Sequence, residues 1–164
     1  MNGRDVIRAS LASTRHLLPM YLADLSDADL FVRPVPGANH IALQLGHLIS
    51  SEVGMVRQQL PAALYPELPA GFSEAHDLKN AGKDGPAGFL KKADYLGLFD
   101  RVRAATIENA AALSDADLDK PTVGQMAPFA PKLGDFLLLV TNHTMMHAGQ
   151  FSVVRRKLGK PILF

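Results

Sequence analysis

Two histidines one helical turn apart are the residues of this sequence best suited to chemistry. His143 and His147 lie in the segment NHTMMHAGQ, residues 142–150. If that segment is helical, residues four apart project from the same face, so both imidazoles can reach one metal ion. The same spacing also arises in helices that bind nothing, so the pair alone leaves two ordinary core or surface histidines as the alternative.

The apolar pattern around this pair places it in the core. Alternating steps of four and three residues link Phe136, Val140, His143, His147, Gln150 and Val154. These steps are typical of the buried face of a helix, so three polar side chains occupy positions where a bundle core expects apolar ones. An unpaired buried polar group costs about 1–3 kcal/mol, so these groups need partners, and a metal would be one. Gln150 is a candidate for contact with the ligands or a substrate.

A third histidine, His47, lies in a second segment with helical periodicity, residues 41–60. It stands off the apolar stripe of that segment, on a face that it shares with Leu43, Ser50, Ser51 and Gly54. Small side chains on this face allow a neighbouring helix or a ligand to come close. We therefore expect His47 to line a pocket beside the core, although a single histidine there would carry no function by itself.

Glu52 is the other weak catalytic candidate, because it lies on the apolar stripe of the same segment. A carboxylate there needs a basic partner such as Arg15, or an edge that reaches solvent. The remaining histidines are His16, His40 and His76, and we expect none of them to be a ligand. His40 is predicted to be exposed or to cap a helix, and His76 lies in a loop.

Four helical segments must position these residues. The first carries an apolar stripe from Ile7 to Tyr21, and the others span about 41–60, 94–113 and 133–158. Asn39 is the expected N-cap of the second, and Gly159 is a suitable residue to end the fourth. Between the second and third, residues 61–91 are rich in Pro and Gly, which predicts a long loop with a short helical piece near 73–78. The basic residues 155–157 are expected at the surface.

One motif occurs twice and supports the same architecture. LSDADL is found at residues 25–30 and again at 113–118, each time after a predicted helix. Its Ser-Asp-Ala-Asp portion is typical of a capped helical turn, used either as a simple helix ending or in a pseudo-repeat of two helix hairpins. The chain is therefore predicted to be all-α, a single antiparallel four-helix bundle domain over residues 1–164.

Composition narrows the function. The 164 residues are 48% hydrophobic and 20% charged, with a net charge of +1, which disfavours a nucleic-acid binder. No apolar run approaches the ~20 residues that cross a bilayer, and no signal peptide is recognisable, so a cytoplasmic protein without a membrane partner is expected. There is no cysteine. A metal would therefore be bound by His, Asp or Glu, without thiolate ligands.

The sequence resembles the DinB-like (DinB/YfiT-type) family of four-helix metal-binding proteins. The resemblance rests on PGANHI at 36–41, LGHL at 45–48 and HTMMHAGQ at 143–150, and on the order of helices and loops over nearly the whole chain. It implies that His47, His143 and His147 bind one divalent transition metal, Ni²⁺ or Zn²⁺. It also implies a homodimer.

Three imidazoles would leave coordination positions open, which is typical of catalytic rather than structural sites. The resemblance implies a metal-dependent enzyme of the thiol S-transferase type that acts on a small molecule with a low-molecular-weight thiol. The alternatives are a metal-dependent hydrolase and a non-catalytic, metal-binding or stress-associated bundle.

Overall fold

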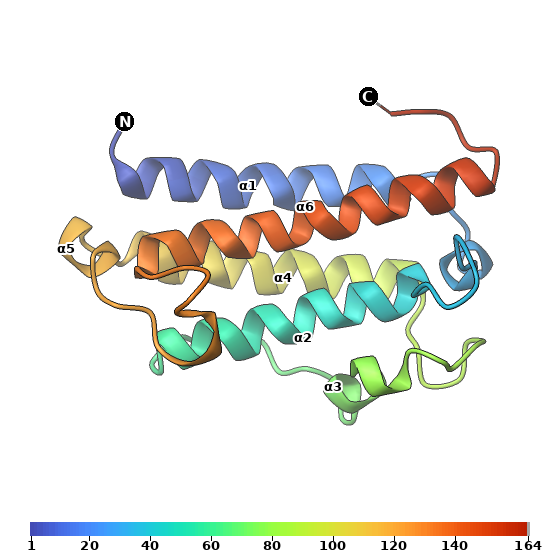
Figure 1. The fold of residues 1–164 in the computed structure, drawn as a ribbon, viewed down its shortest axis with the longest axis horizontal. Coiled ribbons are helices and arrows are strands. Elements are labelled where there is room, and N and C mark those ends of the chain that lie inside the picture. The colour runs from blue at the N-terminus through green and yellow to red at the C-terminus, as the bar shows by residue number, and fades with distance from the viewer. Residues whose placement is uncertain (164) are drawn as a thin grey trace.

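Four long helices lie side by side in the computed structural model, which describes residues 1–163 (Figure 1). They are α1 (Gly3–Leu22), α2 (Ile41–Gln59), α4 (Lys92–Ala111) and α6 (Leu133–Lys157). Single helical turns make up the other elements: α3 (Phe72–Ala75), α5 (Asp115–Leu118), η1 (Ala28–Phe31), η2 (Leu78–Asn80) and η3 (Gly124–Met126). Residues 1–163 contain no strand. The predicted all-α four-helix bundle is confirmed.

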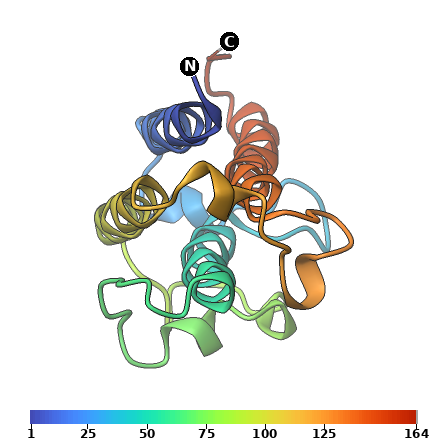
Figure 2. The same cartoon turned by 90° about the vertical axis from the view of Figure 1, so that its left-hand side faces the viewer.

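The helices run in two directions. α1 and α6 point one way and α2 and α4 the other (Figure 1). α2 and α4 are parallel although they follow one another, because the long loop carries the chain back along the bundle before α4 begins. Seen from the end, the helices form a ring in the order α1, α6, α2, α4, and the loop lies on the outer side of α2 (Figure 2). α2 and α6 are thus neighbours.

The start of α2 differs from the prediction. His40, not Asn39, is the N-cap, and its Nδ1 accepts the backbone N–H of Leu43 at 3.1 Å. Since Nδ1 accepts, Nε2 carries the proton and donates to the carbonyl oxygen of Lys83 at 3.2 Å. His40 thus caps the helix, one of the two roles predicted for it, and is fully buried rather than exposed. It connects the first turn of α2 to the long loop.

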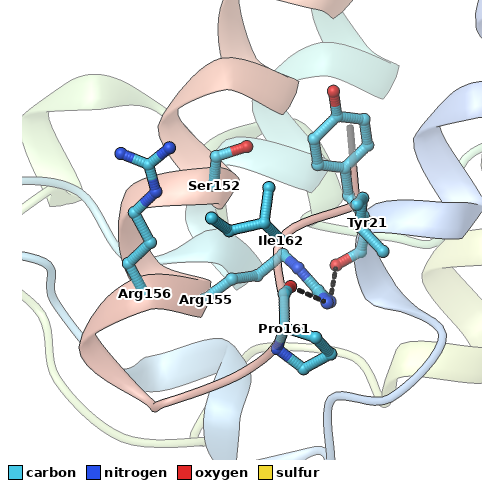
Figure 3. Close-up of a pocket in the computed structure, with 7 residues that line it drawn as sticks. Tyr21, Ser152, Arg155, Arg156, Pro161 and Ile162 are labelled. Atoms are coloured by element: carbon cyan, nitrogen blue, oxygen red, sulfur yellow. Dashed lines mark hydrogen bonds between the residues drawn. The ribbon is translucent and has the colours of Figure 1, made fainter.

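The end of α6 follows the prediction at Gly159 and departs from it at Arg155. Gly159 has a φ of 68° and closes the helix with the paired backbone bonds of a Schellman motif. Arg155, however, is buried and forms an ion pair with Asp24. It also donates to the carbonyl oxygens of Tyr21 at 3.0 Å and Pro161 at 3.1 Å (Figure 3). The side chain of Arg155 therefore links the ends of α1 and α6, and its charge is not available to a ligand.

Both copies of the repeated motif cap a helical turn. In the second copy, Ser114 and Asp117 form a reciprocal capping box at the start of α5. In the first, the N–H of Asp29 donates to Ser26 Oγ at 3.2 Å, and the N–H of Ser26 donates to Asp29 Oδ2 at 2.8 Å. The same reciprocal bonds thus form in both copies, as the sequence predicted, although the N-cap of η1 is the next residue, Asp27, which makes no side-chain cap bond.

The apolar stripes meet in the middle of the bundle. The predicted stripe of α1 is buried, and so are the residues predicted to line α2 from Ile41 to Val56. No helix within residues 1–163 combines the length and the hydropathy that spanning a bilayer requires.

Candidate metal centre

The three histidines singled out from the sequence come together where α2 packs beside α6. His47 comes from α2, and His143 and His147 from successive turns of α6. One ring nitrogen of each can be chosen so that all three lie within 4.8 Å of one another. The ring centroids are 5.2 Å apart for His47 and His143, 5.5 Å for His47 and His147, and 4.8 Å within the α6 pair.

The spacing of the α6 pair fits a shared cation. The two Nε2 atoms of His143 and His147 are 3.2 Å apart. Zn–N bonds of ~2.0–2.1 Å in tetrahedral geometry place two ligand nitrogens about 3.4 Å apart, which is close to this distance. All three donors are imidazole nitrogens, a ligand type that suits Zn²⁺ and Ni²⁺. The residues present therefore fit a divalent transition metal.

The electrostatics of the cluster keep the rings neutral. Burial, together with the neighbouring His143 and His47, lowers the pKa of His147 to about 3. Burial together with the nearby His47 lowers the pKa of His143 to about 4. Burial also lowers the pKa of His47. At neutral pH each imidazole thus keeps one nitrogen lone pair, which is the form that binds metals.

A residue that the sequence analysis did not identify, Gln44, orients one of these rings. Its Oε1 lies 2.7 Å from Nδ1 of His147, and its side-chain amide donates to the carbonyl oxygen of Asn39 at 2.8 Å. Because Oε1 can only accept, His147 must carry its proton on Nδ1, which leaves Nε2 free to face the cluster. The sequence signal for this role was a glutamine three residues before His47, and the structure shows that this glutamine is buried. On α2 itself, Ser51 Oγ lies 3.2 Å from Nδ1 of His47.

Gln150 does not occupy the buried position predicted for it. It is exposed, because the buried stripe of α6 continues from Thr144 through Ala148 to Phe151. Seven residues make slightly less than two full turns of an α-helix. Residues seven apart, such as His143 and Gln150, therefore point in slightly different directions, and the later one lies farther from the core. His143, at the edge of the stripe, is only half-buried for the same reason.

Glu52 is buried in an ion pair, and the prediction that Arg15 is its partner is wrong. The guanidinium of Arg103 on α4 donates to both carboxylate oxygens of Glu52 at 2.8 Å. The side chains of Arg103 and Glu52 are 0% and 4% exposed. Arg15 instead pairs with Asp100 on the surface, with Nε 2.6 Å from Oδ1.

Further hydrogen bonds saturate this pair. The hydroxyl of Thr106 donates to Glu52 at 2.6 Å and accepts the hydroxyl of Tyr65 at 2.8 Å. Arg103 also donates to the hydroxyls of Thr14 and of Thr144, the residue next to His143. Burial raises the pKa of Tyr65 to about 12, so it stays protonated. Glu52 thus lies in a structural network under the histidine cluster.

A histidine outside the cluster packs the long loop against α2 and bonds it to α4. His76 is buried and donates from Nδ1 to the carbonyl oxygen of Phe72 at 2.7 Å, while its Nε2 accepts the hydroxyl of Tyr95. A Cβ on Gly46 would lie 1.9 Å from its Cδ2, so only glycine permits this contact. His16 is exposed on α1. His16, His40 and His76 are all absent from the cluster.

One cavity of the structure is lined by His47. It has a volume of about 380 Å³ and lies between α2 and the loop, where Ser50, Ser51, Ser73 and Asp77 also line it. A second cavity, of about 100 Å³, lies beside Arg155 at the chain's C-terminal segment (Figure 3). The cavity at His47 is the one that places polar residues next to a member of the cluster.

Comparisons with known proteins agree with this architecture. Residues 10–151 match the family model of the DinB superfamily. Among solved structures, the chain is similar to YfiT from Bacillus subtilis, described as a probable metal-dependent hydrolase with an unusual four-helix bundle topology. The two are 17% identical, with a TM-score of 0.69 over 96% of this chain and 89% of the other, a likeness of fold. Comparison with curated proteins gives no match. Since the family model spans most of the bundle, the chain belongs to the DinB superfamily.

Proposed function

We propose that this protein is a metal-dependent enzyme whose Ni²⁺ or Zn²⁺ ion is bound by His47, His143 and His147. The observation that carries the proposal is the convergence of three neutral imidazoles, with no carboxylate in the group. Structural zinc sites are closed by four protein ligands, so a three-ligand centre has room for a substrate. A divalent cation there would act as a Lewis acid that lowers the pKa of a bound thiol or water.

Within this class we favour a thiol S-transferase that uses a low-molecular-weight thiol and a small electrophile. Glu52 is engaged by Arg103 and Thr106, so it is not free to act as a general base. A thiol has an ordinary pKa near ~8.5, far below that of water, and needs less help to lose its proton. Gln44 supports the same role, because it orients the imidazole of His147 without supplying a base.

A metal-dependent hydrolase is the second candidate. It is favoured by the likeness to YfiT, which is described as a probable enzyme of that kind. The homodimer and the cytoplasmic location expected from the sequence stay part of our proposal.

Turnover by the metal-loaded protein tests these candidates. The protein, loaded with Ni²⁺ or Zn²⁺, is incubated with bacterial low-molecular-weight thiols and a panel of epoxides and maleylpyruvate, and in parallel with esters and amides. We expect thiol consumption that is lost in His143→Ala and kept in His16→Ala, an exposed histidine outside the cluster. Ester or amide hydrolysis without thiol consumption would replace the transferase with the hydrolase. No turnover under any loading would favour the non-catalytic bundle.

A further inference from the structure

Two adjacent cavities, together called the groove, lie along the outer side of α2 from His47 to Arg57. The cavity at His47 and a neighbouring cavity of about 560 Å³ share Ser50 and Ser73 as lining residues. Because they share these two residues, the cavities are adjacent, and both lie between α2 and the loop. The neighbouring cavity is also lined by Gly54 and Arg57.

The floor of this groove is one face of α2. His47, Ser50, Gly54 and Arg57 follow one another by steps of three and four residues, which places them in a line along the helix. Ten residues at 1.5 Å each separate the ends by about 15 Å along the helix axis. The middle of the floor is open, since a Cβ on Gly54 would meet nothing within 4 Å.

Arg57 provides a cation at the far end of the groove. Its guanidinium lies 5.7 Å from the ring centroid of Tyr65, and no ion pair joins it to a carboxylate within residues 1–163. The buried arginines Arg103 and Arg155, in contrast, are each paired with an acidic side chain. A guanidinium left free at the end of a groove is suited to a carboxylate, which it can bind through two parallel hydrogen bonds.

We infer that the groove binds an elongated substrate whose reacting group lies at the histidine cluster and whose far end carries a carboxylate bound by Arg57. This inference rests on the proposed function and adds a substrate class to it. Long side chains at both ends shorten the distance to be spanned, so the molecule needs roughly 8–12 Å between its two groups. Glu67 lines the same cavity as Arg57, and its negative charge opposes the anion.

The opposite charges of Arg57 and Glu67 give the inference a signature that a change in folding would not produce. Arg57→Gln should weaken binding of a carboxylate, whereas Glu67→Gln should strengthen it. Both side chains are exposed, so each substitution leaves the core intact. Arg8→Gln, an exposed arginine on α1, is the matched control.

The test uses the full chain with Co²⁺ in the cluster and two thiols of equal length, mercaptohexanoate and mercaptohexanol. Binding is measured from the change in the Co²⁺ absorption spectrum. We expect the carboxylate thiol to bind about three- to fivefold more tightly, the range for an exposed charged pair. Arg57→Gln should remove this preference, Glu67→Gln should increase it, and Arg8→Gln should leave it unchanged. Mercaptopropionate, too short to span the groove, should be insensitive to Arg57→Gln.

Two outcomes separate failure of the inference from failure of the proposed function. If both thiols change the spectrum but bind equally, or if the preference survives Arg57→Gln, the carboxylate site is wrong and the open metal centre stands. If neither thiol changes the spectrum of the Co²⁺-loaded protein, the open centre itself is refuted, and the substrate class falls with it.

Discussion

Replacing Glu52 by glutamine should destabilise the fold rather than remove a catalytic group. The substitution keeps the size of the side chain but takes away the negative charge that faces Arg103. The guanidinium of Arg103 is 0% exposed, so it would remain as a charge without a counter-ion in the core. Glu52 also accepts the hydroxyl of Thr106, so part of the hydrogen-bond network would be lost as well.

The size of the effect follows from the burial of the pair. Removing one partner of a buried ion pair costs about 3–5 kcal/mol of unfolding free energy. For a domain of this size each kcal/mol corresponds to about 2–4 °C in Tm, so we expect a decrease of roughly 6–20 °C. The surface pair of Arg15 and Asp100 is the matched comparison, since its side chains are 36% and 56% exposed. Asp100→Asn should cost about 0–1 kcal/mol.

Urea denaturation and thermal melting of the two variants measure this difference. The double variant Glu52→Leu/Arg103→Met should recover most of the lost stability, because replacing both charges leaves no unpaired ion. Two results would refute the reasoning. One is an equal, small loss in Glu52→Gln and Asp100→Asn. The other is loss of turnover by Glu52→Gln at unchanged stability, which would make Glu52 part of the catalytic machinery.

Three further predictions concern the cluster and the loop. Gln44→Leu should weaken metal binding about 10–100-fold, which is the usual effect of losing a group that orients a ligand. Gln150→Leu, at an exposed position, should leave metal binding unchanged. Metal-competition titrations measure both affinities. Metal-free protein should lose stability as the pH falls from about 6.5 toward 4. In that range the unfolded chain binds protons that the two α6 histidines, with pKa values lowered to about 4 and about 3, do not bind when folded. Denaturation at pH 7 and pH 5 should show this slope. Gly46→Ala should destabilise the protein by displacing His76, while Gly54→Ala, with open space around it, should be neutral or stabilising by thermal melting.

The sequence predicted the helices and the α6 histidine pair because both depend on local periodicity, whereas only the family resemblance joined His47 to that pair. Each apolar stripe repeats at the spacing of a helix, and His143 and His147 are on one turn of the same element. The capped turns of the repeated motif are equally local. These features need no knowledge of how the helices pack.

The features that the sequence did not predict depend on packing between distant segments. Arg103 contacts Glu52 although the two are 51 residues apart in the sequence, and His147 contacts Gln44 at a separation of 103 residues. No spacing rule links such residues, so Arg15 was an equally reasonable partner for Glu52. The burial of Arg155 also depends on contacts with the end of α1. The parallel course of α2 and α4 depends on the path of the long loop, which has little periodicity of its own.

The metal content of the purified protein tests the central claim most directly. Elemental analysis of the wild-type chain and of His147→Ala, with circular dichroism to verify that both are folded, gives the result in one measurement. We predict one divalent transition metal ion per wild-type chain, Ni²⁺ or Zn²⁺, and a folded His147→Ala variant without it. A wild-type protein that neither contains nor takes up either ion, or a variant that keeps it fully, would contradict the three-histidine centre.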